Sequence, residues 1–257
     1  MGIDFLRQNQ YNIGLTPAIQ QNNYGKKIYF GNQNYGDSFQ NSSPYVLFDE
    51  NQIKRMIAQN YEIKKIMSAN NFPLRLNIEE LNQLKEGHCK NTQEICAQIV
   101  KNLPPSLKFG VNIKNLKDAA LLHDFGKVLI PPEILNKHGA LTVQEHKLMD
   151  LHAQLGYELL KNTGVNKEVL YMVRYHHANL NDKNIVPDIN LQILNLADKY
   201  SALTENRVYK KAMTPKQALT ILYSEVKKGE IDPILFNTLV KIVWQQNSAN
   251  QTLTSLR

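Results

Sequence analysis

The chain has 257 residues, of which 42% are hydrophobic and 21% are charged. This balance is typical of a globular protein and excludes a fully disordered chain, a collagen and a long coiled coil. The 30 Lys and Arg residues outnumber the 23 Asp and Glu residues, which gives a formal net charge of +7. A positive charge suits a partner that carries phosphate, but it does not predict specific nucleic-acid binding, and we expect none.

The sequence carries no signal for a membrane or for secretion. No apolar stretch reaches the roughly 18 residues that a transmembrane helix needs. The first ten residues, MGIDFLRQNQ, lack the basic and apolar regions of a secretory signal. Cys89 and Cys96 are seven positions apart on one predicted helix, too far apart for a disulfide within it. We therefore expect a cytoplasmic protein with reduced thiols.

Residues 1–45 differ in composition from the rest of the chain. They contain seven Asn and six Gln but only five charged residues, and no helical or strand period is sustained. Such a stretch buries too little apolar surface to offset the conformational entropy lost on ordering. We predict a disordered, low-complexity extension without a catalytic role.

From residue 46 onward, the apolar residues recur with the period of an α-helix. Asp49 can cap a first helix that continues to the break at Pro73. Asn77 can cap a second helix that ends at Pro104, with a kink at Gly87. A third helix is predicted from Asn115 into the segment before residue 126.

The second half of the chain contains several helix-start signals. Thr142 and Glu145 have the spacing of a capping box. Further N-cap residues are Asn166, Asp188, Thr214 before Pro215, and Asp232 before Pro233. With no convincing strand pattern, the sequence predicts one all-α domain over residues 46–245, a frayed tail over 246–257, and Trp244 as a core anchor.

Seven titratable side chains occupy inward-facing or helix-terminal positions on five predicted helices. They are His88, His123, Asp124, His152, His176, His177 and Asp198. Buried imidazoles and carboxylates are costly unless they are paired or bound to a metal. Separate structural roles would require a partner for each residue, whereas two shared cations would serve them all.

The residue types indicate the chemistry of such a site. Imidazoles and carboxylates without thiolates favour Fe, Mn, Zn, Co or Ni over Ca or Mg. Asp124 could bridge two cations that hold a hydroxide nucleophile between them and clamp a phosphoryl group. Lys127, one turn later, could add a fixed positive charge near the phosphate oxygens. The sequence thus predicts Asp124 and Lys127 as catalytic residues.

Ordered motifs over about residues 85–245 resemble a known family. The run His123-Asp124-Phe125-Gly126-Lys127 with Ile130-Pro131 resembles the HDxGK…IP signature of HD-superfamily metal-dependent phosphohydrolases. Four further segments resemble motifs of the HD-GYP subfamily: residues 134–145 (IL-K-x-G-x-LT-x-x-E), His152 with Gly156 (H-x-x-x-G), His176-His177, and residues 197–210 (ADxYDALT…RPYR).

The resemblance implies an HD-domain helical bundle with two divalent metal ions, iron or manganese. One metal would be held by His88, His123, Asp124 and Asp198, and the other by Asp124, His152, His176 and His177. Lys127, Arg207 and Lys210 would bind the phosphate or the outer part of a cyclic dinucleotide. Family members generally hydrolyse cyclic di-GMP, so the implied partner is a phosphate-containing nucleotide, and the chain could also form a homodimer.

Three positions depart from the family pattern. Residues 178–187 contain no Gly-Tyr-Pro, although the corresponding loop helps to shape the substrate pocket in the family. Leu84 stands where trinuclear members have Glu, which predicts two metals and not three. Val208 replaces a proline.

These departures leave three hypotheses open. The first is a phosphodiesterase that hydrolyses a cyclic dinucleotide such as cyclic di-GMP by attack of a metal-bridging hydroxide. The second is an HD hydrolase of another nucleotide or phosphoester. The third is a catalytically silent regulatory module that keeps the scaffold, although an intact ligand set argues against it.

Overall fold

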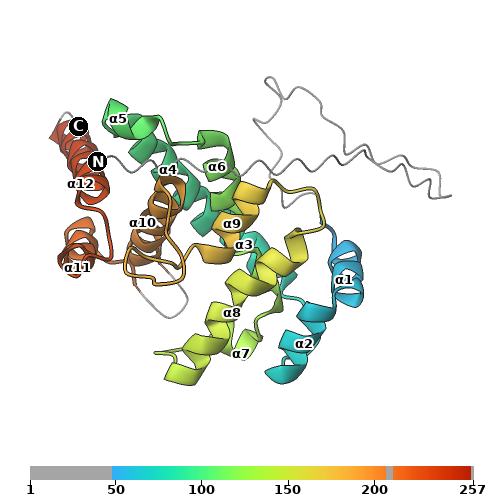
Figure 1. The fold of residues 1–257 in the computed structure, drawn as a ribbon. Helices are drawn as coiled ribbons and strands as arrows, with labels where there is room; N and C mark the ends of the chain where they lie inside the picture. The colour runs from blue at the N-terminus through green and yellow to red at the C-terminus, as the bar shows by residue number, and fades with distance from the viewer. Residues whose placement is uncertain (1–47, 207–210, 256–257) are drawn as a thin grey trace, which may run out of the picture. The chain divides into compact units, whose positions relative to one another are not determined.

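The computed structural model describes residues 48–206 and 211–255, and every regular element within these ranges is helical (Figure 1). The predicted all-α fold is therefore confirmed for this part of the chain. The predicted extension over residues 1–45 lies outside the described residues, as do Arg207 and Lys210. The predicted domain limits stay a prediction.

The first predicted helix is in fact two helices, α1 (Glu50–Gln59) and α2 (Tyr61–Ala69). Asp49 caps α1 as expected, with a capping box. Asn60 then ends α1 and caps α2, because its side chain accepts a hydrogen bond from the backbone N–H of Ile63. An asparagine side chain competes with helical backbone bonds in this way and so breaks the run.

The second predicted helix is interrupted where the kink at Gly87 was expected. It consists of α3 (Ile78–Leu84), one π-helical turn (Lys85–Cys89) and α4 (Lys90–Asn102). A π-helical turn adds a residue to the turn and re-aims the side chains that follow. Here the turn contains His88, which is buried with only 4% of its surface exposed.

The core forms around α6 (Ile113–Leu122), which follows the short helix α5 (Pro105–Lys108). Helix α6 packs against α4, α9 (Lys167–Tyr175) and α10 (Ile189–Thr204). The chain continues in a 3₁₀ helix (Phe125–Leu129), which packs on α8 (Val143–Leu160). Between these two elements in the sequence lies α7 (Pro132–Leu135), a single helical turn. The C-terminal end of the third predicted helix therefore lies in the core, whereas the first residue of α6, Ile113, is exposed.

The predicted start signals of the later helices are confirmed. Thr142 and Glu145 form the capping box of α8, and Asn166 and Asp188 cap α9 and α10. Thr214 caps α11 (Pro215–Lys227). Asp232 accepts hydrogen bonds from the backbone N–H groups of residues 234 and 235 at the start of α12 (Pro233–Ser255).

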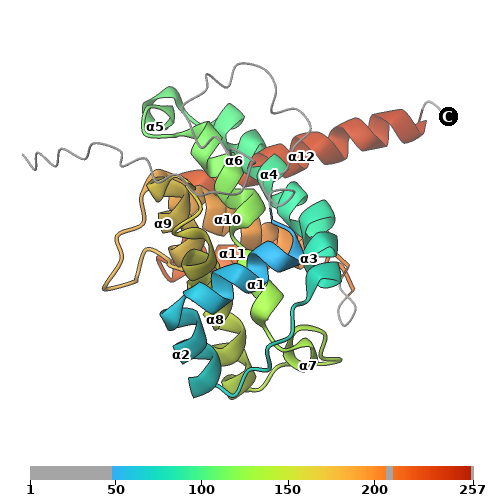
Figure 2. The ribbon, with the colours of Figure 1, turned by 90° about the vertical axis from the view of Figure 1, so that its right-hand side faces the viewer.

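One prediction about the end of the chain is wrong, that of Trp244, and the frayed tail over 246–257 stays a prediction. Helix α12 continues to Ser255, past residue 246 where fraying was predicted, and its last turns extend beyond α4 (Figure 2). Trp244, predicted as a core anchor, is 67% exposed, because Ile242 and Val243 occupy the inward face of α12.

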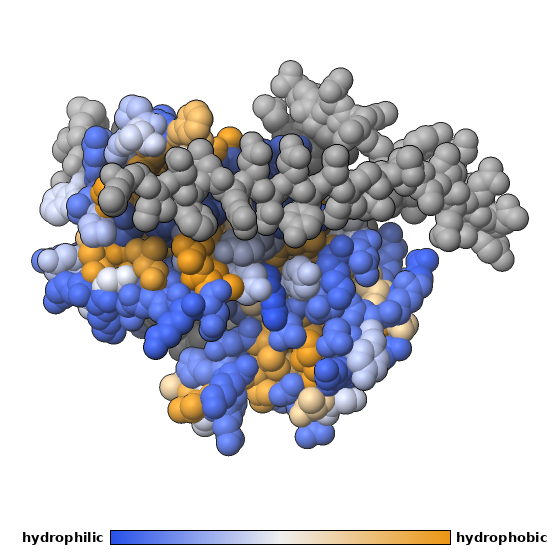
Figure 3. All heavy atoms as spheres, viewed as in Figure 1, coloured by the Kyte–Doolittle hydropathy of each residue, from blue (hydrophilic) through white to orange (hydrophobic). Residues whose placement is uncertain are grey.

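The surface is mixed in character. On the face in Figure 3, hydrophilic residues cover most of the coloured surface, and several apolar patches interrupt them. Among the helices that the structure describes, none is both long and apolar enough to cross a bilayer.

The packing of the 3₁₀ helix on α8 allows no side chain at residue 126. A Cβ atom on Gly126 would lie 2.0 Å from the carbonyl oxygen of His152 and 2.4 Å from the backbone nitrogen of Gly156. Both obstacles are backbone atoms, so the two elements would have to move apart. This explains the glycine in the HDxGK run.

We expect Gly126→Ala to lower the free energy of unfolding by about 1–3 kcal/mol, the usual range for overpacking a core. Urea denaturation would measure the change. Gly87→Ala is the matched control, because no atom lies within 4 Å of a Cβ atom built there. Equal destabilisation by both substitutions would contradict the packing argument.

Candidate metal centre

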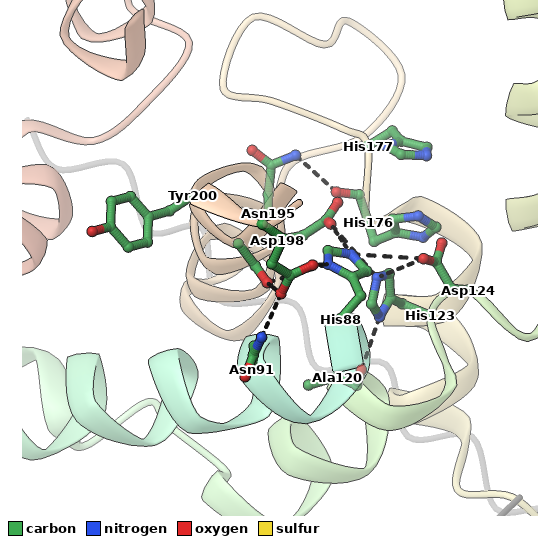
Figure 4. Close-up of polar contacts among 12 residues, drawn as sticks. His88, Asn91, Ala120, His123, Asp124, His176, His177, Asn195, Asp198 and Tyr200 are labelled. Atoms are coloured by element: carbon green, nitrogen blue, oxygen red, sulfur yellow. Dashed lines mark hydrogen bonds and ion pairs between the residues drawn. The ribbon is translucent and has the colours of Figure 1, made fainter. Parts of the chain in front are cut away.

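Five segments bring the seven predicted ligands into one cluster, and Figure 4 labels all of them except His152. His88 comes from the π-helical turn, and His123 and Asp124 from the junction of α6 with the 3₁₀ helix. The other four come from α8, the end of α9 and α10: His152, His176, His177 and Asp198. Residues more than a hundred positions apart in the sequence thus meet at one site.

The cluster contains two groups of three potential ligands each. The ligand atoms of His88, His123 and Asp124 all lie within 4.8 Å of one another, and those of His152, His176 and His177 do the same. In the first group, the fourth predicted ligand is Asp198, whose Oδ1 is 2.9 Å from His88 Nε2 and 3.6 Å from His123 Nε2.

Asp124 faces both groups with different oxygens. Its Oδ2 lies 3.7 Å from His88 Nε2 and 3.5 Å from His123 Nε2. Its Oδ1 lies 3.2 Å from His152 Nε2. A carboxylate in this position can offer one oxygen to each of two cations, as a bridging ligand does.

The backbone fixes the tautomers of three histidines. The Nδ1 atoms of His123, His152 and His176 lie 2.9, 2.6 and 2.9 Å from the carbonyl oxygens three residues earlier. A carbonyl oxygen only accepts, so each Nδ1 carries the proton and each Nε2 presents a lone pair to the cluster.

These lone pairs converge without a donor between them. His152 Nε2 lies 3.1 Å from His176 Nε2 and 3.3 Å from His177 Nε2. His123 Nε2 is buried and has no hydrogen-bond partner among the described residues. Unpaired buried acceptors are costly, and a cation between them would satisfy them all. The residues present therefore fit metal ions.

At His176, His177 and Asp124 the electrostatics favour the protonation states that bind a metal. Burial, together with the neighbouring imidazoles, holds the pKa of His176 well below its usual range, and burial lowers the pKa of His177 to about 4. Burial alone would raise the pKa of Asp124, but Lys127 and His123 hold it well below its usual value. Neutral imidazoles and ionised carboxylates are the forms that coordinate cations.

A pocket of about 810 Å³ opens onto the cluster. It reaches the side chains of His88, Asp124, Lys127, His152, His177 and Asp198. Lys127 is only 9% exposed, and its Nζ donates to Asp124 Oδ2 at 2.7 Å. The volume lies in the range usual for small-molecule sites.

The loop over residues 178–187, which departs from the family pattern, lies away from this pocket. The backbone N–H of Leu180 donates to the carbonyl oxygen of Glu230, and the Asn181 side chain donates to that of Lys228. Of the described residues that line the pocket, none comes from this loop. Much of the lining comes instead from α3, from the π-helical turn and from residues 134–150.

The sequence did not predict the two residues that contact Nδ1 of His88, on the ring edge away from Asp124 and Asp198. Glu205 Oε2 lies 3.0 Å from His88 Nδ1, and Ser201 Oγ lies 3.2 Å from the same atom. Burial alone would lower the pKa of His88, but hydrogen bonds to Asp198 and Glu205 raise it to about 9. A usable signal was the position of Glu205, one helical turn after Ser201 on the same face of α10.

Asn195 joins the two halves of the site. Its side chain donates to the carbonyl oxygen of His176 at 2.7 Å, which ties α10 to the end of α9 (Figure 4). Asn195 is buried and lies three residues before Asp198 on the same helix. The relative position of Asp198 and the histidine pair is therefore fixed by a direct contact.

Three relatives share part of their length with this chain. The cyclic di-GMP phosphodiesterase response regulator RpfG of Xanthomonas campestris pv. campestris is 33% identical over 141 residues, covering 50% of this chain and 36% of the relative. The 3'3'-cGAMP-specific phosphodiesterase 1 of Vibrio cholerae serotype O1 is 26% identical over 174 residues, or 64% and 39% of the two chains. The cyclic di-GMP phosphodiesterase PA4108 of Pseudomonas aeruginosa is 32% identical over 133 residues, which cover 49% of this chain and 32% of the relative.

The chain thus spans well under half the length of these relatives. The model of the HD domain family matches residues 75–235, which is more than half of the chain and includes every described residue of the cluster. Together with the helical fold and the gathered histidines and aspartates, this match shows that the chain belongs to the HD domain family.

Proposed function

We propose that this chain is a metal-dependent phosphodiesterase that hydrolyses a cyclic dinucleotide with the help of two divalent cations, iron or manganese. The observation that carries the proposal is the pair of ligand groups joined by Asp124. His88, His123, Asp124 and Asp198 would hold one cation. Asp124, His152, His176 and His177 would hold the other.

The reaction would add one water molecule across one phosphodiester bond and yield a linear dinucleotide. Bound cations would activate the water and neutralise charge on the phosphate. Asp124 would serve as a ligand in both groups and so hold them close together. Lys127, held 2.7 Å from Asp124 at the base of the pocket, would bind a phosphate oxygen and stabilise charge that develops there.

The substrate class is supported by the names of the relatives, which include both cyclic di-GMP and 3'3'-cGAMP phosphodiesterases. Arg207 and Lys210 stay predicted contacts for the outer part of such a ligand. The cytoplasmic location and the homodimer also stay predictions.

A second candidate is a hydrolase of another nucleotide or phosphoester. It is favoured by one observation, the loop over residues 178–187, which lies against the turn between α11 and α12 and not at the pocket. A silent regulatory module is the third outcome that the experiments below distinguish.

Metal content tests the role of Asp124. Protein purified without air should carry two Fe or Mn ions per chain, and Asp124→Asn should lose them because the shared ligand no longer carries charge. Added Mn²⁺ at 100 times its dissociation constant should stabilise the unmodified chain by about 2.7 kcal/mol. His138→Gln, at an exposed histidine outside the cluster, is the control and should keep both ions. Full metal loading of Asp124→Asn would contradict the bridging role.

Turnover tests the role of Lys127. We expect Lys127→Met to lower kcat on a cyclic dinucleotide by about 10²–10³-fold, the usual effect of removing one donor to a transition-state anion, while the metal content is kept. Lys147→Met, at an exposed lysine on α8, should have no effect.

The substrate panel should contain cyclic di-GMP, 3'3'-cGAMP and bis(p-nitrophenyl) phosphate. Turnover of the generic diester alone would favour the second candidate. Two bound metals without turnover of any ester would favour the silent module.

A further inference from the structure

We propose that Glu205 is a positioning residue that orients His88 toward one of the two metals, in place of a carboxylate one helical turn earlier. The inference rests on the proposed function, because it assigns a role within the same metal site. It concerns the first ligand group alone, since Glu205 forms its hydrogen bond and ion pair with His88 and not with the histidines of the second group.

The side chain of Glu205 is held at both oxygens. Oε2 lies 3.0 Å from His88 Nδ1. Oε1 accepts from Asn91 Nδ2 at 2.7 Å and from the hydroxyl of Ser201. The Glu205 side chain is 18% exposed, and His88 is its only ion-pair partner among the described residues. Its charge therefore serves the imidazole of His88 in this part of the molecule.

His88 needs this partner because its backbone setting differs from that of the other histidines. His123, His152 and His176 place the Nδ1 proton on a carbonyl oxygen three residues earlier. His88 lies in the π-helical turn, and its Nδ1 faces α10, where Glu205 accepts. A carboxylate that receives the Nδ1 proton of a histidine fixes the ring and makes the other nitrogen a better ligand.

The contact at Nδ1 also determines what the other ring nitrogen of His88, Nε2, faces. With the Nδ1 proton donated to Glu205, Nε2 faces Asp198 Oδ1 within hydrogen-bond distance, 2.9 Å away, and Asp124 Oδ2 at 3.7 Å. Two acceptors at that separation repel unless a proton or a cation lies between them. Glu205 thus sets the direction from which His88, Asp124 and Asp198 can share one cation.

The position of Glu205 points to an exchange along α10. In the ADxYDALT motif quoted above, an aspartate stands where this chain has Ser201. Ser201 Oγ lies 3.2 Å from His88 Nδ1, so a carboxylate on residue 201 would reach the same nitrogen. Glu205 lies four residues later, at the C-cap of α10, and its longer side chain reaches back to that atom.

Glu205→Gln tests the proposal by metal titration, because the amide has nearly the same shape but no charge. We expect the affinity for one of the two metals to fall by about 10–100-fold, as for other residues that orient a ligand, while the second metal still binds as in the unmodified chain. Titration with Mn²⁺, followed by electron paramagnetic resonance and by metal analysis, would separate the two steps. Glu225→Gln is the control, since it removes a carboxylate 2.6 Å from Lys199 on α10 without touching His88.

A rescue distinguishes positioning from a merely structural role. The double variant Ser201→Asp with Glu205→Ser should regain the lost metal affinity, because it returns a carboxylate to His88 Nδ1 from one turn earlier. A helix-capping or packing role of Glu205 would not be rescued in this way.

Two results would overturn the inference alone: unchanged affinity for both metals in Glu205→Gln, or no recovery in the double variant. An unmodified chain that binds no metal would overturn the proposed function and the inference with it.

Discussion

The candidate site depends on the hydrogen bonds that hold imidazole Nδ1 protons on backbone carbonyl oxygens. His123 and His176 lie at the C-caps of α6 and α9, where helix carbonyls lack intrahelical partners. These carbonyls take the Nδ1 protons, and the Nε2 lone pairs then point to a common volume. The same helix ends that terminate secondary structure therefore aim the ligands, so the site is built into the fold and does not need separately ordered loops.

A second constraint places Asp124 between the two ligand groups. The 3₁₀ helix that follows Asp124 lies so close to α8 that only glycine fits at residue 126. This approach carries Asp124 to His152, with Oδ1 3.2 Å from Nε2. Without it, the first group would remain on α6 and the π-helical turn, and the second on α8 and α9, with no carboxylate between them. The glycine of the HDxGK run and the position of Asp124 between the two ligand groups thus have one physical cause.

Much of this arrangement could be predicted from local sequence. Caps such as Thr142 and Asp188 act within three residues, and the spacing of histidines and aspartates along helices is also a local property. What escaped prediction depends on contacts across the chain. The break at Asn60 is fixed by its amide, which donates to the carbonyl oxygen of Glu158 almost a hundred residues later. The contact between Glu205 and His88 likewise spans 117 positions, and the helical spacing of Glu205 from Ser201 points to the face of α10 without naming His88 as the partner.

One carboxylate connects the pocket-lining segment around Lys137 to α8, which carries His152. Glu145 closes the capping box of α8 by accepting from the backbone N–H of Thr142, and it also accepts from Lys137 at 2.6 and 2.8 Å. The Lys137 ammonium, together with the bond from Thr142, lowers the pKa of Glu145 to about 2. Lys137 lines the pocket, and α8 carries His152. The segment that Glu145 fixes to α8 therefore lines the pocket, whereas the loop over residues 178–187 does not reach it.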